Sequence, residues 1–156
     1  MVSSLYVGFD LATACGMAMV QGDRYESYRG NFRPPMRYKH FRQWVRLSIW
    51  VMMEQMDKDN IHVAYEMPHA RGRYATRVLI GMECMVIDVC EELGLEKPMD
   101  VHSGTLKKYF TGNGRADKAM MMAEATKRCG RPITDDNEAD AIAVAMWLRD
   151  ELEDDK

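Results

Sequence analysis

The alternation of hydrophobic and polar residues predicts a series of short strands. They cover residues 5–10, 16–20, 24–29, 61–66 and 99–102. The strand at 24–29 has a polar outward face, which suits the edge of a sheet. The runs 5–10 and 61–66 are typical of buried strands, and each ends in a carboxylate, Asp10 and Glu66 respectively.

Helical periodicity fills much of the remaining chain. The predicted helices cover residues 36–57, 74–93, 103–110, 117–129 and a last segment that begins near residue 135. The expected apolar stripe of the first helix consists of Phe41, Trp44, Val45, Ser48, Val51, Met52 and Gln55. Gly94 is expected to close the second helix, and Ser103 to cap the third.

The order of these elements predicts an α/β fold. Three antiparallel strands followed by two parallel ones form a five-stranded mixed sheet, which helices flank on both faces. The right-handed crossover rule places strand 61–66 beside strand 5–10, so that Asp10 and Glu66 become neighbours. We expect residues 1–150 to form a single domain and residues 151–156 to form a frayed acidic tail.

The last helix begins with a concentration of acids, in the segment Thr134-Asp135-Asp136-Asn137-Glu138-Ala139-Asp140-Ala141. Asp135 and Glu138 have the spacing of a capping box. Capping does not explain Asp140, which lies past the first turn among alanines and shares a helix face with Asp136. Carboxylates on a largely apolar helix need a partner, and a hard divalent cation is the natural one.

If this helix packs across the end of the sheet, its acids join those of the strands. The resulting metal site comprises Asp10, Glu66, Asp136 and Asp140, with Asn137 on the flank. Oxygen ligands without histidine or thiolate favour Mg²⁺, with Mn²⁺ as a substitute, over zinc. Two such ions about 4 Å apart can clamp a displacement at a phosphodiester. Lys107, Lys118 or Arg115 would neutralise the phosphate charge.

The net charge of −3 conceals an asymmetry along the chain. Residues 135–156 carry nine acids against two bases, a balance of −7 that leaves +4 on the rest of the chain. Much of the positive charge lies in residues 24–46 and 69–77, and such clusters can follow a phosphate backbone. The residues expected to contact DNA are Arg37, Lys39, Arg71, Arg73, Arg77, Lys108 and Arg115.

Two other partners are not expected. No apolar run is long enough to cross a bilayer, and residues 1–6 lack the charge pattern of a signal peptide, so we expect a cytoplasmic protein without a membrane partner. The glycine-containing loop at 111–118 lacks both the GxGxxG spacing and the GK[ST] ending, which argues against a nucleotide cofactor.

Four motifs in this order resemble the RuvC family of Holliday junction resolvases, most closely its compact members of phage and prophage origin. The motifs are Gly8-Phe9-Asp10, Ala64-Tyr65-Glu66, the Lys107 to Lys118 segment with its Thr-Gly-Asn-Gly-Arg-Ala-Asp-Lys core, and Asn137-Glu138-Ala139-Asp140-Ala141. The resemblance covers nearly the whole chain. It implies an RNase H-like fold, a homodimer, Mg²⁺ dependence, and paired symmetrical nicks in four-way DNA junctions that leave ligatable 5′-phosphate ends.

The resemblance also implies residue roles. By position, Asp10, Glu66 and Asp140 match three of the family's four catalytic acids, while Lys107 and Lys118 match basic residues that members need near the scissile phosphate.

Which residue of this chain matches the family's fourth catalytic acid is an open question. Many cellular members have an aspartate three residues before the final one, where this chain has Asn137. Helix geometry offers Asp136 instead, displaced by about 40° from Asp140 around the axis, against about 60° for residue 137. We favour Asp136, although Asn137 could bind through its amide oxygen.

Two other functions are consistent with the same acids. One is a less selective RNase H-like nuclease that acts on flaps, replication forks or RNA–DNA hybrids, since selectivity lies in dimer geometry and surface charge. The other is a non-catalytic DNA-binding protein with the same fold, against which the intact acid set argues.

Two structural features would serve a junction enzyme. Helix 74–93, rich in Met and Ile, is the expected dimer interface. Tyr38, Phe41 and Tyr74 are candidate wedges that open a junction, with burial in the core as the competing interpretation.

Overall fold

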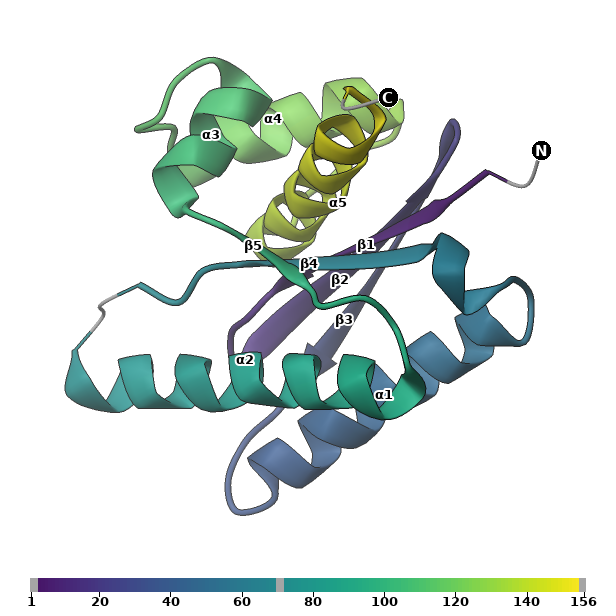
Figure 1. The fold of residues 1–156 in the computed structure, drawn as a ribbon. Helices are drawn as coiled ribbons and strands as arrows, with labels where there is room; N and C mark the ends of the chain where they lie inside the picture. The colour runs from purple at the N-terminus through teal and green to yellow at the C-terminus, as the bar shows by residue number, and fades with distance from the viewer. Residues whose placement is uncertain (1–2, 70–71, 155–156) are drawn as a thin grey trace.

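The computed structural model describes residues 3–69 and 72–154, and in them a sheet is covered by helices on both faces (Figure 1). The strands are β1 (Leu5–Asp10), β2 (Ala14–Gln21), β3 (Arg24–Asn31), β4 (Ile61–Glu66) and β5 (Met99–Val101). The helices are α1 (Arg37–Met53), α2 (Arg73–Leu93), α3 (Ser103–Thr111), α4 (Lys118–Cys129) and α5 (Asp136–Asp154), with a short 3-10 helix, η1 (Lys58–Asn60), before β4.

The strand order is β3-β2-β1-β4-β5. β1 pairs antiparallel with β2, and β2 with β3, whereas β4 runs parallel to β1 and β5 parallel to β4. The predicted mixed sheet is therefore confirmed, as is the crossover that places β4 beside β1. β2 and β3 are longer than predicted because their pairing continues to Ala14 and Asn31.

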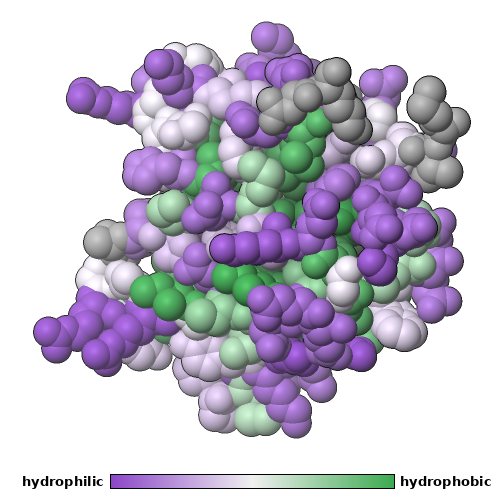
Figure 2. All heavy atoms as spheres, viewed as in Figure 1, coloured by the Kyte–Doolittle hydropathy of each residue, from purple (hydrophilic) through white to green (hydrophobic). Residues whose placement is uncertain are grey.

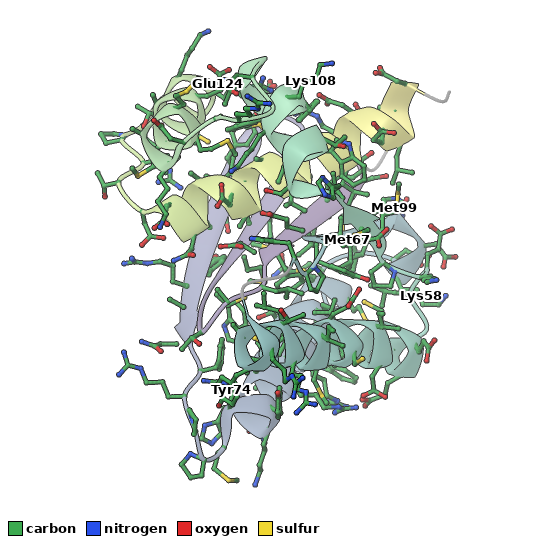
Figure 3. All side chains as sticks on the ribbon, turned by 90° about the vertical axis from the view of Figure 1, so that its left-hand side faces the viewer. Lys58, Met67, Tyr74, Met99, Lys108 and Glu124 are labelled. Atoms are coloured by element: carbon green, nitrogen blue, oxygen red, sulfur yellow. The ribbon has the colours of Figure 1, made fainter. Side chains whose placement is uncertain are left out.

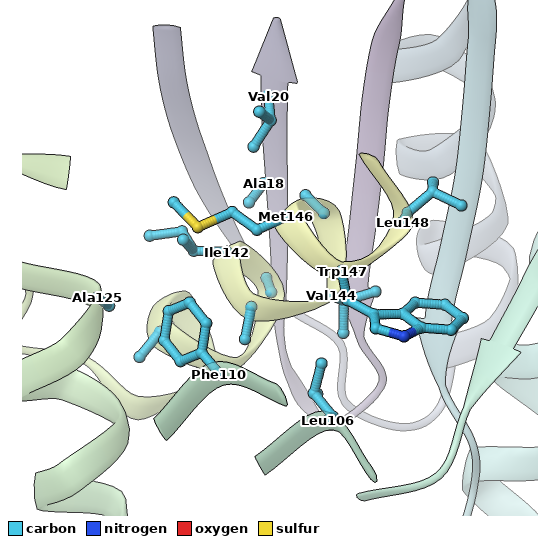
Figure 4. Packing of buried hydrophobic residues seen from close by; sticks show 14 of the residues in the cluster. Ala18, Val20, Leu106, Phe110, Ala125, Ile142, Val144, Met146, Trp147 and Leu148 are labelled. Carbon is cyan, nitrogen blue, oxygen red and sulfur yellow. The ribbon is translucent and has the colours of Figure 1, made fainter. Parts of the chain in front are cut away.

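Successive residues of β1 point to opposite faces of the sheet. Leu5, Val7 and Phe9 pack in the core under α1 and α2, whereas Tyr6 belongs to the core under α3, α4 and α5. By the same alternation Asp10 points toward the α5 side. Figure 4 shows this second core, in which side chains of α5 and α3 pack together over β2.

The buried stripe of α1 is narrower than predicted. It consists of Phe41, Val45, Ile49 and Met52, at spacings of four, four and three residues. The inclusion of Val51 and Gln55 was wrong, because both residues are exposed, and the prediction missed Ile49, which is fully buried. The sheet and α2 cover one flank of α1, and the flank that carries Val51 borders an open groove.

Several helix ends differ from those predicted, and α1 ends at Met53 rather than near residue 57. Asp117, which was expected to begin the helix, instead caps α4, its Oδ1 accepting a hydrogen bond from the Met120 amide at 2.9 Å. The cap of α3 is His102 rather than Ser103, because the His102 Nδ1 atom accepts from the Gly104 amide at 3.1 Å.

The last helix continues farther than expected. α5 extends to Asp154, into the segment predicted to fray, and the Tyr6 hydroxyl donates to Glu153 Oε1 at 3.1 Å. Among the described residues, no helix is both long and apolar enough to span a membrane.

Candidate active site

Two of the predicted site residues end neighbouring parallel strands. Asp10 is the last residue of β1 and Glu66 is the last residue of β4. Phe9 lies opposite Tyr65 in the parallel register, so the residues that follow them are adjacent at the carboxyl edge of the sheet. This juxtaposition confirms the prediction that Asp10 and Glu66 are neighbours.

Two glycines bring α5 close to this edge. A Cβ atom on Gly8 would lie 2.4 Å from the backbone nitrogen of Ala145, and one on Gly16 would lie 2.2 Å from the carbonyl oxygen of Asn137. The backbone of α5 therefore rests directly on β1 and β2, a close approach that a larger residue would prevent. Asp140 lies between these two contacts along α5.

The three acids converge. One carboxylate oxygen from each of Asp10, Glu66 and Asp140 can be chosen so that all three lie within 4.8 Å of one another. All three residues are partly buried. Three anionic groups at this separation repel one another, so the arrangement favours protonation or a bound cation.

The acids line a cavity of about 360 Å³. Among the other residues that line it are Arg37, Lys107, Lys118, Asp136 and Asn137. The cavity lies between the two helical layers. In the view of Figure 3, Met67, which also lines the cavity, lies between Lys108 of α3 and Tyr74 at the start of α2.

The surface around these elements is largely hydrophilic. On the face drawn in Figure 2, hydrophobic side chains gather in the middle of the molecule, between the helical layers, and hydrophilic side chains surround them.

The pKa of Asp140 is raised to about 7, first by burial and then by the charges of Glu66 and Asp136. Lys107 and Lys118 act in the opposite direction. The dominant cause is desolvation of the carboxylate, which disfavours its charged form. A divalent cation would reverse this balance, because it stabilises the ionised carboxylate directly.

The carboxylate of Asp136 has a different environment from that of Asp140. Its carboxylate pairs with the Lys118 ammonium group, which lowers the pKa of Asp136, and two backbone amides lower it further. Among the described residues Asp136 does not belong to the group of acids within 4.8 Å. Asn137 also lines the cavity, while its backbone carbonyl lies against Gly16. The choice between Asp136 and Asn137 as fourth ligand stays a prediction.

The remaining two acids at the start of α5 have structural partners. Asp135 caps the helix, since its Oδ1 accepts from the Glu138 amide at 2.9 Å, and it also pairs with Arg29 at 2.6 Å. The assignment of Glu138 to a capping box was wrong. Its Oε1 accepts instead from Ser27 Oγ on β3 at 2.5 Å and from Arg131 at 2.9 Å.

The predicted DNA-binding residues lie in different places. Arg37 lines the cavity, and its Nε donates to the Phe32 carbonyl at 3.1 Å. The exposed residues that do not line the cavity are Lys39, Arg73, Arg77, Lys108 and Arg115. Arg71 lies outside the described residues. The roles of all of these residues stay predictions.

Sequence reasoning missed one cavity residue and misjudged one core residue. His69 is absent from the predicted site, yet its Nδ1 lies 3.9 Å from Glu66 Oε1 and it lines the cavity. Its position three residues after Glu66 was the available signal.

Phe41 is fully buried, so its interpretation as a wedge is wrong. Tyr74 lines the cavity and is 70% exposed.

Comparison with known proteins identifies the fold. No family model and no curated protein sequence matches the chain. The sheet order with helices on both faces is that of the RNase H-like fold.

Among solved structures, the chain shares the fold of RuvC. The structure of T. thermophilus RuvC in complex with a Holliday junction substrate superposes with a TM-score of 0.78 at 17% identity, over 96% of each chain. A second structure of Thermus thermophilus RuvC gives a TM-score of 0.73 at 16% identity, again over 96% of each chain.

Proposed function

We propose that this protein is a divalent-metal-dependent endonuclease that resolves four-way DNA junctions by paired symmetrical nicks. The observation that carries the proposal is the convergence of Asp10, Glu66 and Asp140 within 4.8 Å, in a cavity that also contains Lys107 and Lys118. The shared fold with RuvC, one structure of which holds a Holliday junction substrate, supports the choice of substrate.

The donor set fits a hard cation. Each of the three acids offers a carboxylate oxygen, and the pKa of Asp140 is raised by burial first and then by the neighbouring acids, a balance that a bound cation would offset. Oxygen-only ligands favour Mg²⁺, or Mn²⁺ in its place. When bound, such ions would activate the attacking water and stabilise the leaving 3′ oxygen of the phosphodiester.

The protein's own groups would position the strand. Lys107 is half-buried and acts electrostatically on Asp140, so it lies deep enough to neutralise a phosphate beside the acids. Arg37 lines the same cavity from the α1 side. Outside it, Arg73 and Arg77 on α2 and Lys108 on α3 lie on opposite helical layers, where they would contact the backbone on either side of the cut.

Paired nicks require two active sites. We propose a homodimer in which α2 forms the interface, because Ile80 and Cys84 on this helix are exposed one turn apart. A two-fold axis through this surface would present two cavities to strands of the same polarity.

A panel of DNA substrates tests this function. The purified full chain would be mixed with Mg²⁺ and a four-way junction, a flap, a linear duplex and an RNA–DNA hybrid of matched length. The proposal predicts that the four-way junction is nicked fastest, in two strands of like polarity. Equal rates on flaps or hybrids would favour the less selective nuclease, and no divalent-dependent cleavage of any substrate would favour a DNA-binding protein.

A further inference from the structure

An ion pair joins two cavity residues that the proposed reaction uses for different purposes. Lys118 is the first residue of α4, Asp136 is the first residue of α5, and the lysine ammonium group contacts the Oδ2 atom of the carboxylate. The Lys118 side chain is 79% exposed, whereas that of Asp136 is 28% exposed. The lysine can therefore change partners while the carboxylate stays in the cavity wall.

In this ion pair, each residue keeps the other from binding a different partner. While the ammonium group contacts the carboxylate, it occupies the position that a metal ion would take beside the same oxygen atoms. The same contact occupies the positive charge that a substrate phosphate would use. Consistent with this pairing, Asp136 lines the same cavity but stands outside the described group of Asp10, Glu66 and Asp140.

We propose that the Lys118–Asp136 ion pair makes a second divalent-cation site conditional on a DNA phosphate. The phosphate competes for Lys118, and the released carboxylate of Asp136 then becomes a ligand beside the three acids. This inference rests on the proposed nuclease function of the cavity. Without DNA, the three acids alone would hold a cation.

The exposure of the pair suits such an exchange. Ion pairs with one highly exposed partner are weak, so a phosphate in the cavity can replace the carboxylate as the partner of Lys118. The complete ligand set would then form only when a phosphodiester is in place. Because linkage is reciprocal, a cation at Asp136 would increase the affinity for DNA by the same factor.

The binding of Mn²⁺ to the full chain, measured by electron paramagnetic resonance, tests the inference without relying on activity. Three proteins would be titrated without DNA: the wild type, Lys118→Met and Lys107→Met. The Lys107→Met variant is the matched control, because Lys107 lines the same cavity and carries the same charge. Thermal unfolding would verify that each variant is folded.

The two lysine variants should behave differently. The wild type should bind one Mn²⁺ tightly, and Lys118→Met should bind a second ion at least about fivefold more tightly than Lys107→Met does. The double variant Lys118→Met/Asp136→Asn should lose this second ion. Wild type mixed with a four-way junction and frozen before turnover should gain it.

Several results would overturn the inference. If the two lysine variants bound the second Mn²⁺ with equal affinity, the effect would be a general loss of positive charge rather than the loss of the Lys118–Asp136 ion pair. Two tight ions on the wild type without DNA, or retention of the second ion after Asp136→Asn, would also contradict it. If the wild type bound no Mn²⁺, the metal-dependent function would fail together with the inference.

Discussion

Gly16 on β2 lies so close to the first turn of α5 that a Cβ atom on it would be 2.2 Å from the carbonyl oxygen of Asn137. Gly16 is also the antiparallel partner of Asp10 in β1. The residue that allows the helix to approach the sheet is therefore beside one of the converging acids. Packing of α5 and the geometry of the acid cluster are coupled at this point.

Gly16→Ala should weaken both stability and metal binding. The added methyl group must push α5 away from the sheet, and overpacking of this kind costs about 1–3 kcal/mol of unfolding free energy. Asp140 would move away from Asp10, so the affinity for Mn²⁺ should fall about tenfold or more. Urea denaturation and calorimetric titration with Mn²⁺ measure the two effects.

Gly104→Ala is the control for this substitution. A Cβ atom there would meet its nearest neighbour, His102 Nδ1, at 3.5 Å, which is an ordinary contact. Replacing a helical glycine should leave stability unchanged or raise it by up to about 1 kcal/mol. If Gly16→Ala were as stable as this control and bound Mn²⁺ as tightly as the wild type, the close approach of α5 would not position Asp140.

Metal affinity should depend on pH through Asp140. Because its pKa is raised to about 7, a cation must displace a proton from this carboxyl group at lower pH. The apparent Kd for Mn²⁺ should therefore rise about tenfold per pH unit below 7 and level off above it. Titrations between pH 5.5 and 8.5 would show this bend, and a flat profile would contradict the assignment of Asp140 as a ligand.

Without metal, Asp140→Asn should stabilise the fold at neutral and alkaline pH. The folded protein keeps a proton on Asp140 that the unfolded chain releases above about 3.8, so the wild type loses stability as the pH rises from about 4 to about 7. The variant avoids this loss, which amounts to at most about 4 kcal/mol. Urea denaturation at pH 4 and pH 8 should show a difference at pH 8 alone.

Saturating Mn²⁺ provides the internal control for that comparison. The cation should stabilise the wild type and leave Asp140→Asn nearly unchanged, because binding to the folded state raises its stability. Equal stabilisation of both proteins would mean that the cation binds elsewhere.

Substitutions of Tyr74 and Phe41 should have different effects, because only Tyr74 is placed to act as a junction wedge, whereas Phe41 lies in the core. Tyr74 is 70% exposed at the cavity, so Tyr74→Ala should leave stability within about 0.5 kcal/mol while weakening junction binding by about 1–3 kcal/mol, the value of one stacked base. Tyr74→Phe keeps the ring and should bind as the wild type does. Phe41→Ala should instead lower stability by about 3–5 kcal/mol. Fluorescence anisotropy and urea denaturation distinguish these outcomes.

The parts of the site that follow from strand order were predictable from the sequence. Asp10 and Glu66 end two apolar runs, and the handedness of the crossover between them leaves one arrangement. The side of α5 on which Asp140 lies was also predictable from its helical position, because the small apolar residues around it require a buried helix. These inferences depend on local patterns and on one topological rule.

Other parts depend on contacts between distant segments, which local patterns do not encode. Glu138 has capping spacing, yet Ser27 and Arg131 draw its carboxylate away from the cap. Lys118 and Asp136 were both assigned to the site, but their pairing required knowledge of how α4 and α5 begin side by side. His69 was missed because the sequence does not show where the loop after Glu66 turns.

The most direct test of the account is the nicking of a four-way junction by the wild type and by Asp140→Asn in Mg²⁺, with junction binding measured on the same samples. Glu151→Gln, an exposed acid on the same helix, is the control and should nick as the wild type does. The account predicts that Asp140→Asn binds the junction within about threefold of the wild type but nicks it at least about a hundredfold more slowly. Mg²⁺-dependent nicking by Asp140→Asn at the wild-type rate would contradict it.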